Sequence, residues 1–201
     1  AVCPRGREAA NGDRCLWFAG TRNRYYVLLC DGMGTGTGAA MDAKMTALFT
    51  ARLLRAGFAC DVAARLVNAA LLTRAPGDRG STLDVLRFDG MDGSATLYKA
   101  GACAAYLLRA GSIRRLGEAA AANGLPLGSA GAVKAARLEL SLQPGDRLIM
   151  VSDGMLAGGE SRLLQAVRTL KEEAPQAVAQ ALLAAAADGR PEDDCTAVVL
   201  C

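Results

Sequence analysis

Three apolar runs of this chain each adjoin an aspartate, and this recurrence restricts how the chain can fold. YYVLLC ends at Asp31-Gly32, RLIMVS ends at Asp153-Gly154, and CTAVVLC begins directly after Asp193-Asp194. If the three runs are strands in facing sheets, their carboxylates can converge on one edge. Carboxylates crowded together without basic partners repel, and they persist when cations lie between them. Oxygen ligands of this kind suit Mg²⁺ or Mn²⁺.

The glycines that follow the first two aspartates have two interpretations. Asp-Gly is a common turn pair, so either pair alone requires no more than a turn. Glycine also lets the backbone pass close to an ion, so that a peptide carbonyl can face it. The presence of all three acidic groups, each beside an apolar strand, favours the metal interpretation.

The glycine-rich segment after Asp31 does not match the common phosphate-binding motifs. A P-loop needs Gly-Lys-Ser/Thr where its helix starts, and this chain has Gly38-Ala39-Ala40 there. The dinucleotide fingerprint needs a βαβ unit, but here the next strand-like run follows two helical patterns and a loop.

Strand-like and helical patterns occur in blocks along the chain rather than in alternation. Apolar and alternating runs predict strands over residues 14–20, 25–30, 81–88, 94–100, 104–110, 112–117, 137–142, 147–152 and 195–201. Helical spacing predicts helices over 39–55, around 62–71, and over 160–171 and 174–187. This order favours an α+β fold with antiparallel sheets, and we predict a single domain over residues 1–201.

Composition excludes several classes of protein. A chain of 201 residues that is 52% hydrophobic suits one globular domain, and its net charge of +3 is too small to indicate nucleic-acid binding. No apolar run approaches the ~20 residues of a membrane span, and no signal peptide is present. We therefore expect a cytoplasmic domain without membrane contact. Because the chain begins at Ala1 rather than Met, we expect a fragment of a longer protein, which could itself be membrane-anchored.

The absence of histidine limits the chemistry further. Without an imidazole the chain cannot form a Ser-His-Asp or Cys-His catalytic site, and zinc binding is poorly supported. The seven cysteines include no C-x-x-C pair, which favours buried, reduced thiols. Catalysis would therefore depend on carboxylates, lysine, arginine, thiols or a metal.

Six motifs in order along the chain resemble the metal-dependent serine/threonine protein phosphatases of the PPM family, also called type 2C. The motifs are LLCDGMGTG (28–36), STLDVL (81–86), KAGACAAYLLR (99–109), LPLG (125–128), GDRLIMVSDGM (145–155) and DDCTAVV (193–199). They are most similar to the bacterial branch represented by the stage II sporulation protein E phosphatase domain. The resemblance implies a four-layer αββα sandwich, in which helix pairs flank two antiparallel sheets.

The resemblance also implies two ions, Mn²⁺ or Mg²⁺, at one edge of the sandwich. Asp31 would bridge both ions, the Gly32 carbonyl would bind one, and Asp153 and Asp193 would each supply a ligand. These aspartates are therefore the residues on which catalysis is expected to depend.

Two further aspartates are weaker candidates on the same resemblance. Asp13, in the early segment NGD, would reach a metal-bound water, and Asp194 is the less favoured ligand of the DD pair.

The implied activity is hydrolysis of phosphoserine or phosphothreonine by a water that two ions activate, with no covalent enzyme intermediate. The implied partner is a small phosphorylated regulatory protein, such as an anti-sigma factor antagonist. An alternative is a catalytically weak phosphatase-like module that binds a phosphoprotein and signals by conformational change.

Three positions depart from the family pattern. Met33 stands where many members have histidine, so another group or water must protonate the leaving oxygen. Ala157 stands where aspartate is common, which puts a third metal site in doubt. Cys195 stands where methionine is usual, a plausible exchange within a core.

The two helices expected after the first acidic loop have two interpretations. They could simply cover a sheet, or they could form a regulatory switch, because tilting the first helix would move Asp31 and Gly32. Their apolar faces could also support homodimer contacts.

Overall fold

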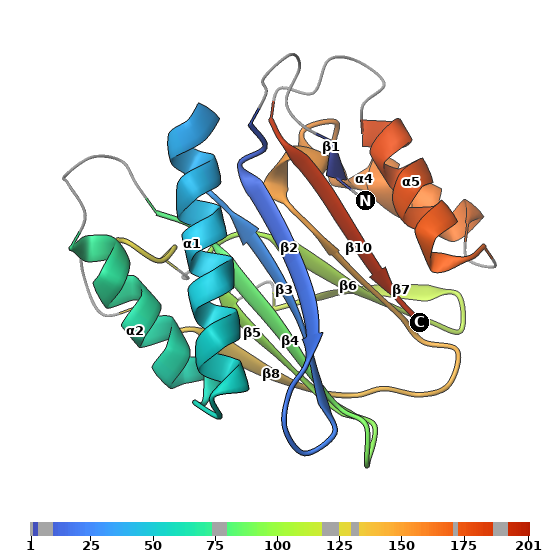
Figure 1. The fold of residues 1–201 in the computed structure, drawn as a ribbon. Helices are drawn as coiled ribbons and strands as arrows, with labels where there is room; N and C mark the ends of the chain where they lie inside the picture. The colour runs from blue at the N-terminus through green and yellow to red at the C-terminus, as the bar shows by residue number, and fades with distance from the viewer. Residues whose placement is uncertain are drawn as a thin grey trace.

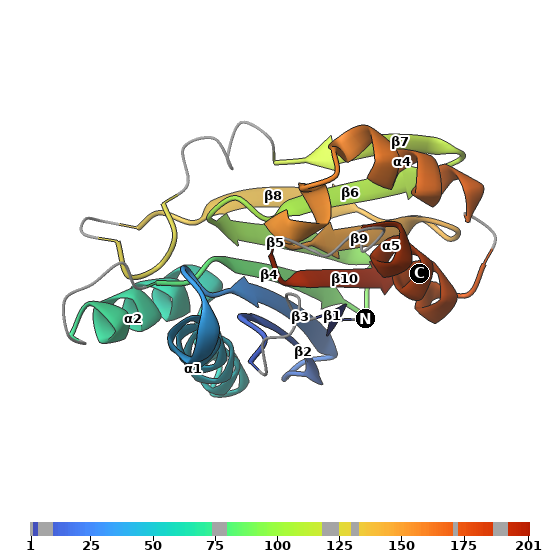
Figure 2. The ribbon, with the colours of Figure 1, turned by 90° about the horizontal axis from the view of Figure 1, so that it is seen from above.

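The fold is a sandwich of two antiparallel five-stranded sheets with a helix pair on each outer face (Figure 1). A computed structural model describes residues 2–3, 10–73, 80–117, 125–129, 133–170, 173–186 and 193–201. The four layers are seen edge-on in Figure 2, with the two sheets between the helix pairs. The predicted α+β class and αββα layering are confirmed.

The first sheet has the strand order β2-β3-β4-β5-β8. Its strands are β2 (Asp13–Ala19), β3 (Arg24–Asp31), β4 (Leu83–Asp89), β5 (Ser94–Ala100) and β8 (Ala136–Ser141). The turn between β2 and β3 is tight because Arg22 and Asn23 both have positive φ, 59° and 55°. Two such residues give a turn whose twist matches that of the strands.

The second sheet has the strand order β1-β10-β9-β6-β7. Its strands are β1 (Val2–Cys3), β10 (Cys195–Leu200), β9 (Arg147–Val151), β6 (Ala104–Arg109) and β7 (Ser112–Leu116). The predicted hairpin turn between β6 and β7 is confirmed, with positive φ at Ala110 and Gly111. The pairing of β1 with β10 was not predicted, because two residues are too short to give a strand pattern.

Each helix pair packs on one sheet. The pair α1 (Gly36–Arg55) and α2 (Cys60–Leu72) covers the first sheet, and the pair α4 (Glu160–Thr169) and α5 (Pro175–Ala186) covers the second. A short 3₁₀ helix, η1 (Asp153–Leu156), follows β9. The prediction placed the start of α1 at residue 39, which is wrong by about one turn, because Gly36 and Gly38 carry no apolar signal.

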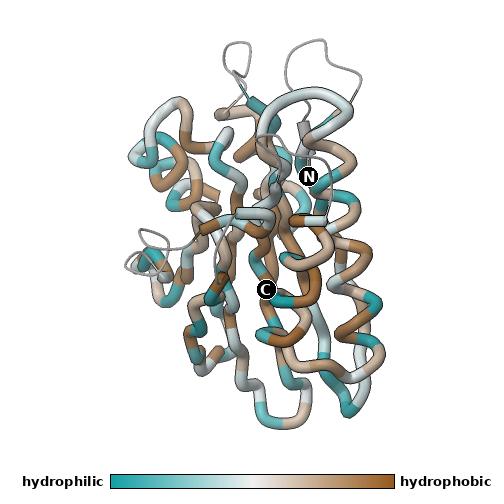
Figure 3. The backbone as a smooth tube through the Cα atoms, turned by 90° about the vertical axis from the view of Figure 1, so that its left-hand side faces the viewer, coloured by the Kyte–Doolittle hydropathy of each residue, from teal (hydrophilic) through white to brown (hydrophobic). Residues whose placement is uncertain are grey.

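The core has three parts, one between the sheets and one beneath each helix pair. Between the sheets, Leu29, Leu86 and Leu97 of the first sheet face Leu107 and Met150 of the second. Along the backbone, hydrophobic stretches are interrupted by hydrophilic positions (Figure 3). The central strands β3, β6 and β9 bury both faces, because each sheet lies between the other sheet and a helix pair. Among the described residues, no helix is both long and apolar enough to cross a membrane.

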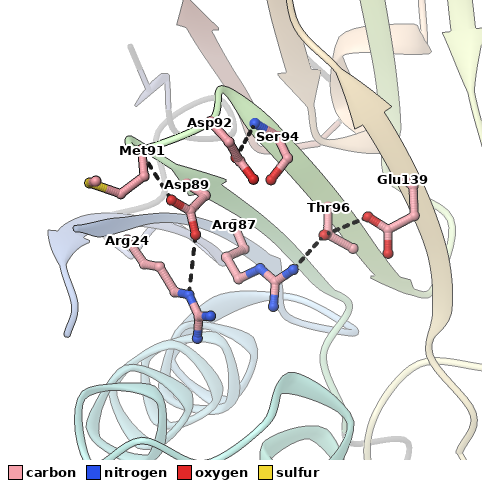
Figure 4. A network of polar contacts seen from close by, with 8 residues as sticks. All are labelled: Arg24, Arg87, Asp89, Met91, Asp92, Ser94, Thr96 and Glu139. Atoms are coloured by element: carbon pink, nitrogen blue, oxygen red, sulfur yellow. Dashed lines mark hydrogen bonds and ion pairs between the residues drawn. The ribbon is translucent and has the colours of Figure 1, made fainter. Parts of the chain in front are cut away.

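A network of polar contacts lies at the end of the first sheet that is distant from Asp31 (Figure 4). Arg24 pairs with Asp89, while Arg87 donates to Thr96, whose hydroxyl donates to Glu139. Arg87, Thr96 and Glu139 are direct cross-strand neighbours on β4, β5 and β8. The charged side chains drawn at this end therefore have partners.

Leu97→Ala tests the packing between the sheets, because the Leu97 side chain is fully buried there. We expect the free energy of unfolding to fall by about 2–5 kcal/mol, since removal of a buried leucine leaves a cavity. Denaturant unfolding followed by circular dichroism measures the change. Met91→Ala is the control, because Met91 is 80% exposed and should change stability by no more than about 0.5 kcal/mol. Equal stabilities of the two variants would contradict the assignment of the core.

Candidate metal centre

The three predicted acidic groups meet at one edge of the sandwich. Asp31 is the last residue of β3, Asp153 begins η1 directly after β9, and Asp193 precedes β10. Together with Gly32 they line a pocket of about 320 Å³, whose other walls are Met33, Gly34, Thr82, Gly101, Ala102 and Pro126. The structure thus brings together the four residues that were predicted as principal metal ligands.

Asp13 lies directly beside this group, although it does not line the pocket. Asp13 on β2 is the cross-strand partner of Asp31 on β3, and its side chain is only 3% exposed. Its Oδ2 atom is buried without a hydrogen-bond partner among the described residues. Such an oxygen is costly to bury unless a cation or a proton satisfies it.

Asp194 has a different environment from Asp193. Its Oδ2 atom accepts a hydrogen bond of 2.5 Å from the Gly12 amide, and the residue is buried. The Asp194 amide in turn donates to Asp193 Oδ1 at 2.8 Å. The Asp194 carboxylate therefore holds the loop before β2 against the start of β10, and the pocket is lined by Asp193.

The glycine after each of the first two aspartates is required by close packing of the backbone. A Cβ atom on Gly32 would lie 2.0 Å from the Ala39 carbonyl oxygen in the first turns of α1. A Cβ atom on Gly154 would lie 2.2 Å from the Asp194 carbonyl oxygen. Both glycines thus allow neighbouring segments to approach the acidic edge, a reason that the sequence interpretation did not include.

Burial and mutual repulsion change the acidity of these aspartates. The pKa of Asp31 rises to about 9, mainly by burial and then by the nearby charges of Asp153 and Asp13. The pKa of Asp13 rises to about 7, mainly by burial, although the hydroxyls of Ser152 and Thr196 oppose the rise. Without a cation, the site therefore retains protons at neutral pH. A divalent cation could replace them and would find only oxygen donors, as Mg²⁺ and Mn²⁺ prefer.

Within the described part of the chain, no three acidic or thiol side chains lie close enough to form a preassembled metal cluster. The carboxylates therefore surround the pocket, but they are not close enough together to coordinate one ion as they stand. This fits carboxylates that repel each other, and a cation would have to draw them together.

Residues of three other motifs also line the site, and the sequence analysis assigned them no role. They are Thr82, the pair Gly101 and Ala102 of KAGACAAYLLR, and Pro126. Thr82, in STLDVL, accepts a hydrogen bond from the Asp31 amide at 3.0 Å. Pro126, in LPLG, lies beside Leu127, whose amide and carbonyl both bond to Ser81 at 2.9 Å. The signal for these residues was their place in the motifs, but only the fold shows what they contact.

The three departures from the family pattern occupy different positions. Met33 lines the pocket and is 41% exposed. Ala157 follows η1 and does not line the pocket. Cys195 is buried at the start of β10, and its thiol contacts the Asp193 carbonyl oxygen at 3.6 Å.

A second cavity, of about 390 Å³, lies between the sheets at the opposite strand ends. Its lining is mainly apolar, including Val27, Leu86 and Leu148, and its Asp146 is paired with Arg109. Asp146 is the one acidic residue among its described lining residues, so the candidate site is the acidic edge.

Comparisons with known proteins show to which family the chain is similar. A family model described as "Stage II sporulation protein E (SpoIIE)" matches residues 21–201. The stage II sporulation protein E of Bacillus subtilis (strain 168) is 26% identical over 209 residues, which cover 100% of this chain and 25% of that protein.

Solved structures are similar over nearly the whole chain. A structure of the PP2C phosphatase domain and a regulatory-domain fragment of SpoIIE from Bacillus subtilis has a TM-score of 0.87 and 26% identity, covering 99% of this chain and 60% of that one. A structure of RsbX in complex with magnesium has a TM-score of 0.76 and 15% identity, covering 99% and 91%. The second likeness shows the fold alone.

Asp31→Asn should stabilise the metal-free protein, and increasingly so as the pH rises. The pKa of Asp31 is raised from its ordinary 3.8 to about 9, so the folded state holds a proton that the unfolded state releases above about pH 4. The stability of the original protein therefore falls between those two values, whereas asparagine does not titrate. Melting temperatures in chelator at about pH 5 and pH 8 measure the difference.

Asp61→Asn is the control, because Asp61 is exposed on α2 beside Arg65. If the difference in melting temperature between Asp31→Asn and the original protein stays constant with pH, the pKa assigned to Asp31 is contradicted.

Proposed function

The chain belongs to the stage II sporulation protein E family, and we propose that it is a divalent-metal-dependent phosphatase acting on phosphoserine or phosphothreonine of a small regulatory protein. The resemblance inferred from the motifs is thereby confirmed. The observation that carries the proposal is the pocket in which Asp31, Asp153 and Asp193 meet. The chain spans about a quarter of the length of its Bacillus subtilis relative, so activity and substrate are proposed here for this chain alone.

The proposed metal ligands are Asp31, the Gly32 carbonyl, Asp153 and Asp193. The raised pKa of Asp31 and the all-oxygen donor set support two Mn²⁺ or Mg²⁺ ions, and the structurally similar RsbX was solved with magnesium. When bound, two such ions would lower the pKa of a water and neutralise phosphoryl oxygens.

The remaining residues would act by position. Asp13, behind Asp31, would orient a water at the site, since its buried Oδ2 needs a donor. Asp194 would keep Asp193 in place through its bond to the Gly12 amide. Met33 has no proton to give, so the leaving serine oxygen would be protonated by water or another group.

The likeness to SpoIIE leads us to propose an anti-sigma factor antagonist as the phosphoprotein. We also propose that residues 1–201 are one phosphatase domain of a longer protein, located in the cytoplasm and attached to the membrane through other segments. A homodimer through the apolar faces of α1 and α2 is part of the same proposal; Met41 and Leu48 of α1 are exposed.

Phosphatase activity should require added divalent metal, with Mn²⁺ most effective. Hydrolysis of para-nitrophenyl phosphate and of a phosphoserine protein is measured after chelation and after return of Mn²⁺ or Mg²⁺. Activity that survives thorough chelation would rule out the proposed chemistry. Binding of the phosphoprotein without any metal-stimulated hydrolysis would favour the signalling module instead.

Asp31→Asn and Asp13→Asn form a matched pair for this test. Asp31 would hold the metal directly, whereas Asp13 lies behind it, so the loss of Asp31 should reduce activity more than the loss of Asp13. Equal activities in the two folded variants would contradict the assignment of roles.

Met33→His should increase phosphoserine hydrolysis more than hydrolysis of an activated ester. A serine alkoxide needs a proton on leaving, whereas para-nitrophenolate does not, and general acid catalysis contributes at least about 10²-fold when it is well placed. The ratio of kcat/KM values for the two substrates measures the effect. Met33→Gln is the control, since its amide has no titratable proton, and a ratio equal in both variants would contradict the role of Met33's position.

A further inference from the structure

A lysine is buried between the two sheets directly behind the acidic edge. Lys99 on β5 is 1% exposed, and its ammonium group pairs with Asp84 on β4, which is fully buried. The two residues are direct cross-strand partners, and Asp84 also lies opposite Leu29, two residues before Asp31. Fully buried lysines are rare unless they are paired.

The ammonium group of Lys99 has a second partner in the connection between the sheets. Nζ donates a hydrogen bond of 2.6 Å to the Cys103 carbonyl oxygen. Residues 101–103 lead from β5 of the first sheet to β6 of the second. Gly101 and Ala102 of this crossover form one wall of the acidic pocket, so Lys99 holds that wall from behind.

The crossover contacts Asp31 through Thr82. The Cys103 thiol and the Thr82 hydroxyl are hydrogen-bonded at 3.2 Å. The same hydroxyl accepts from the Asp31 amide at 3.0 Å, and the Thr82 amide donates to the Asp31 carbonyl oxygen at 2.8 Å. Gly101 packs so closely on Thr82 that a Cβ atom there would lie 2.7 Å from Thr82 Cγ2.

The burial of the Lys99–Asp84 ion pair between the sheets is energetically costly. Asp84 Oδ1 is buried without a hydrogen-bond partner among the described residues, and burial raises the pKa of Asp84 to about 6 against the influence of Lys99. Well-packed apolar residues often replace a buried ion pair without loss of stability. Stability alone therefore does not account for Lys99.

We propose that Lys99 is a positioning residue of the metal centre, which fixes the 101–103 crossover and, through Cys103 and Thr82, the backbone of Asp31. The proposal rests on the function proposed above. Asp84 serves to hold the ammonium group in place, directed at the Cys103 carbonyl.

The test is the double variant Lys99→Met/Asp84→Leu, which removes both charges and retains the volume. We expect a melting temperature close to that of the original protein, because no unpaired charge is left. We expect about 10- to 100-fold weaker Mn²⁺ binding by calorimetry, the usual effect of losing a residue that supports a metal ligand. The Mn²⁺ concentration for half-maximal activity should rise in parallel.

Arg109→Met/Asp146→Leu is the matched control. This pair also links a charged contact to a backbone carbonyl, that of Ser141, but at the opposite end of the sandwich. It should leave Mn²⁺ binding unchanged. If the two double variants bind Mn²⁺ equally well, the proposal is overturned.

If the double variant does not fold, Thr82→Val and Thr82→Ser test the same link to Asp31. Valine keeps the shape and removes the acceptor of the Asp31 amide, so Mn²⁺ binding should weaken; serine keeps the hydroxyl and should restore it. Equal Mn²⁺ binding by the two would overturn the proposal. If the original protein neither binds Mn²⁺ nor hydrolyses phosphate esters, the proposed function and this inference are both overturned. The other outcomes concern this inference alone.

Discussion

The Asp31 carboxyl is half-buried next to Asp153 and Asp13, and its pKa rises to about 9, mainly because burial disfavours its charge and then because these two acids lie nearby. A fold that concentrates carboxylates in this way gives up stability at neutral pH unless cations are present. The rest of the sandwich can be understood as the means of holding these groups together. Three strand ends bring the acids to one edge, and the layers of core on either side of each sheet keep those ends fixed.

Backbone contacts hold the edge as much as side chains do. Gly32 accommodates the first turns of α1 and Gly154 accommodates the start of β10, each at a distance that no other residue allows. Ser152 joins β9 to β10, since its amide donates to the Thr196 carbonyl at 3.1 Å and its hydroxyl accepts from the Thr196 amide at 2.9 Å. The positions of Asp153 and Asp193 are therefore coupled through adjacent strands before any ligand binds.

The sequence predicted every described strand except β1 and indicated that the acids could converge, whereas the layering was implied by the family resemblance. The run SATLYKA gave β5 at residues 94–100 with the bounds that the structure has, because Ala95 and Leu97 recur at the two-residue spacing of a strand and are buried between the sheets. Helix α1 was placed too late because Gly36 and Gly38 in its first turn carry no hydrophobic signal. The ion pair of Asp84 and Lys99 was also missed, because partners 15 residues apart become neighbours only through strand register.

The two ends of the sandwich differ in how they treat charge. At the end distant from Asp31, Arg24 pairs with Asp89 and Arg109 pairs with Asp146, contacts that neutralise each acid (Figure 4 shows the first). Partly exposed pairs of this kind contribute little to stability, and the hydrogen bonds from Arg109 lower the pKa of Asp146. At the other end no such pair involves Asp31 or Asp13 among the described residues, and the ammonium group of Lys99, which pairs with Asp84, donates to a carbonyl of the crossover. A chain that pairs acids with arginines at one end and gathers Asp31, Asp153 and Asp13 at the other departs from the rules of stability where function is expected. The buried lysine is consistent with this asymmetry, since a cation placed within the pocket itself would compete with the metal.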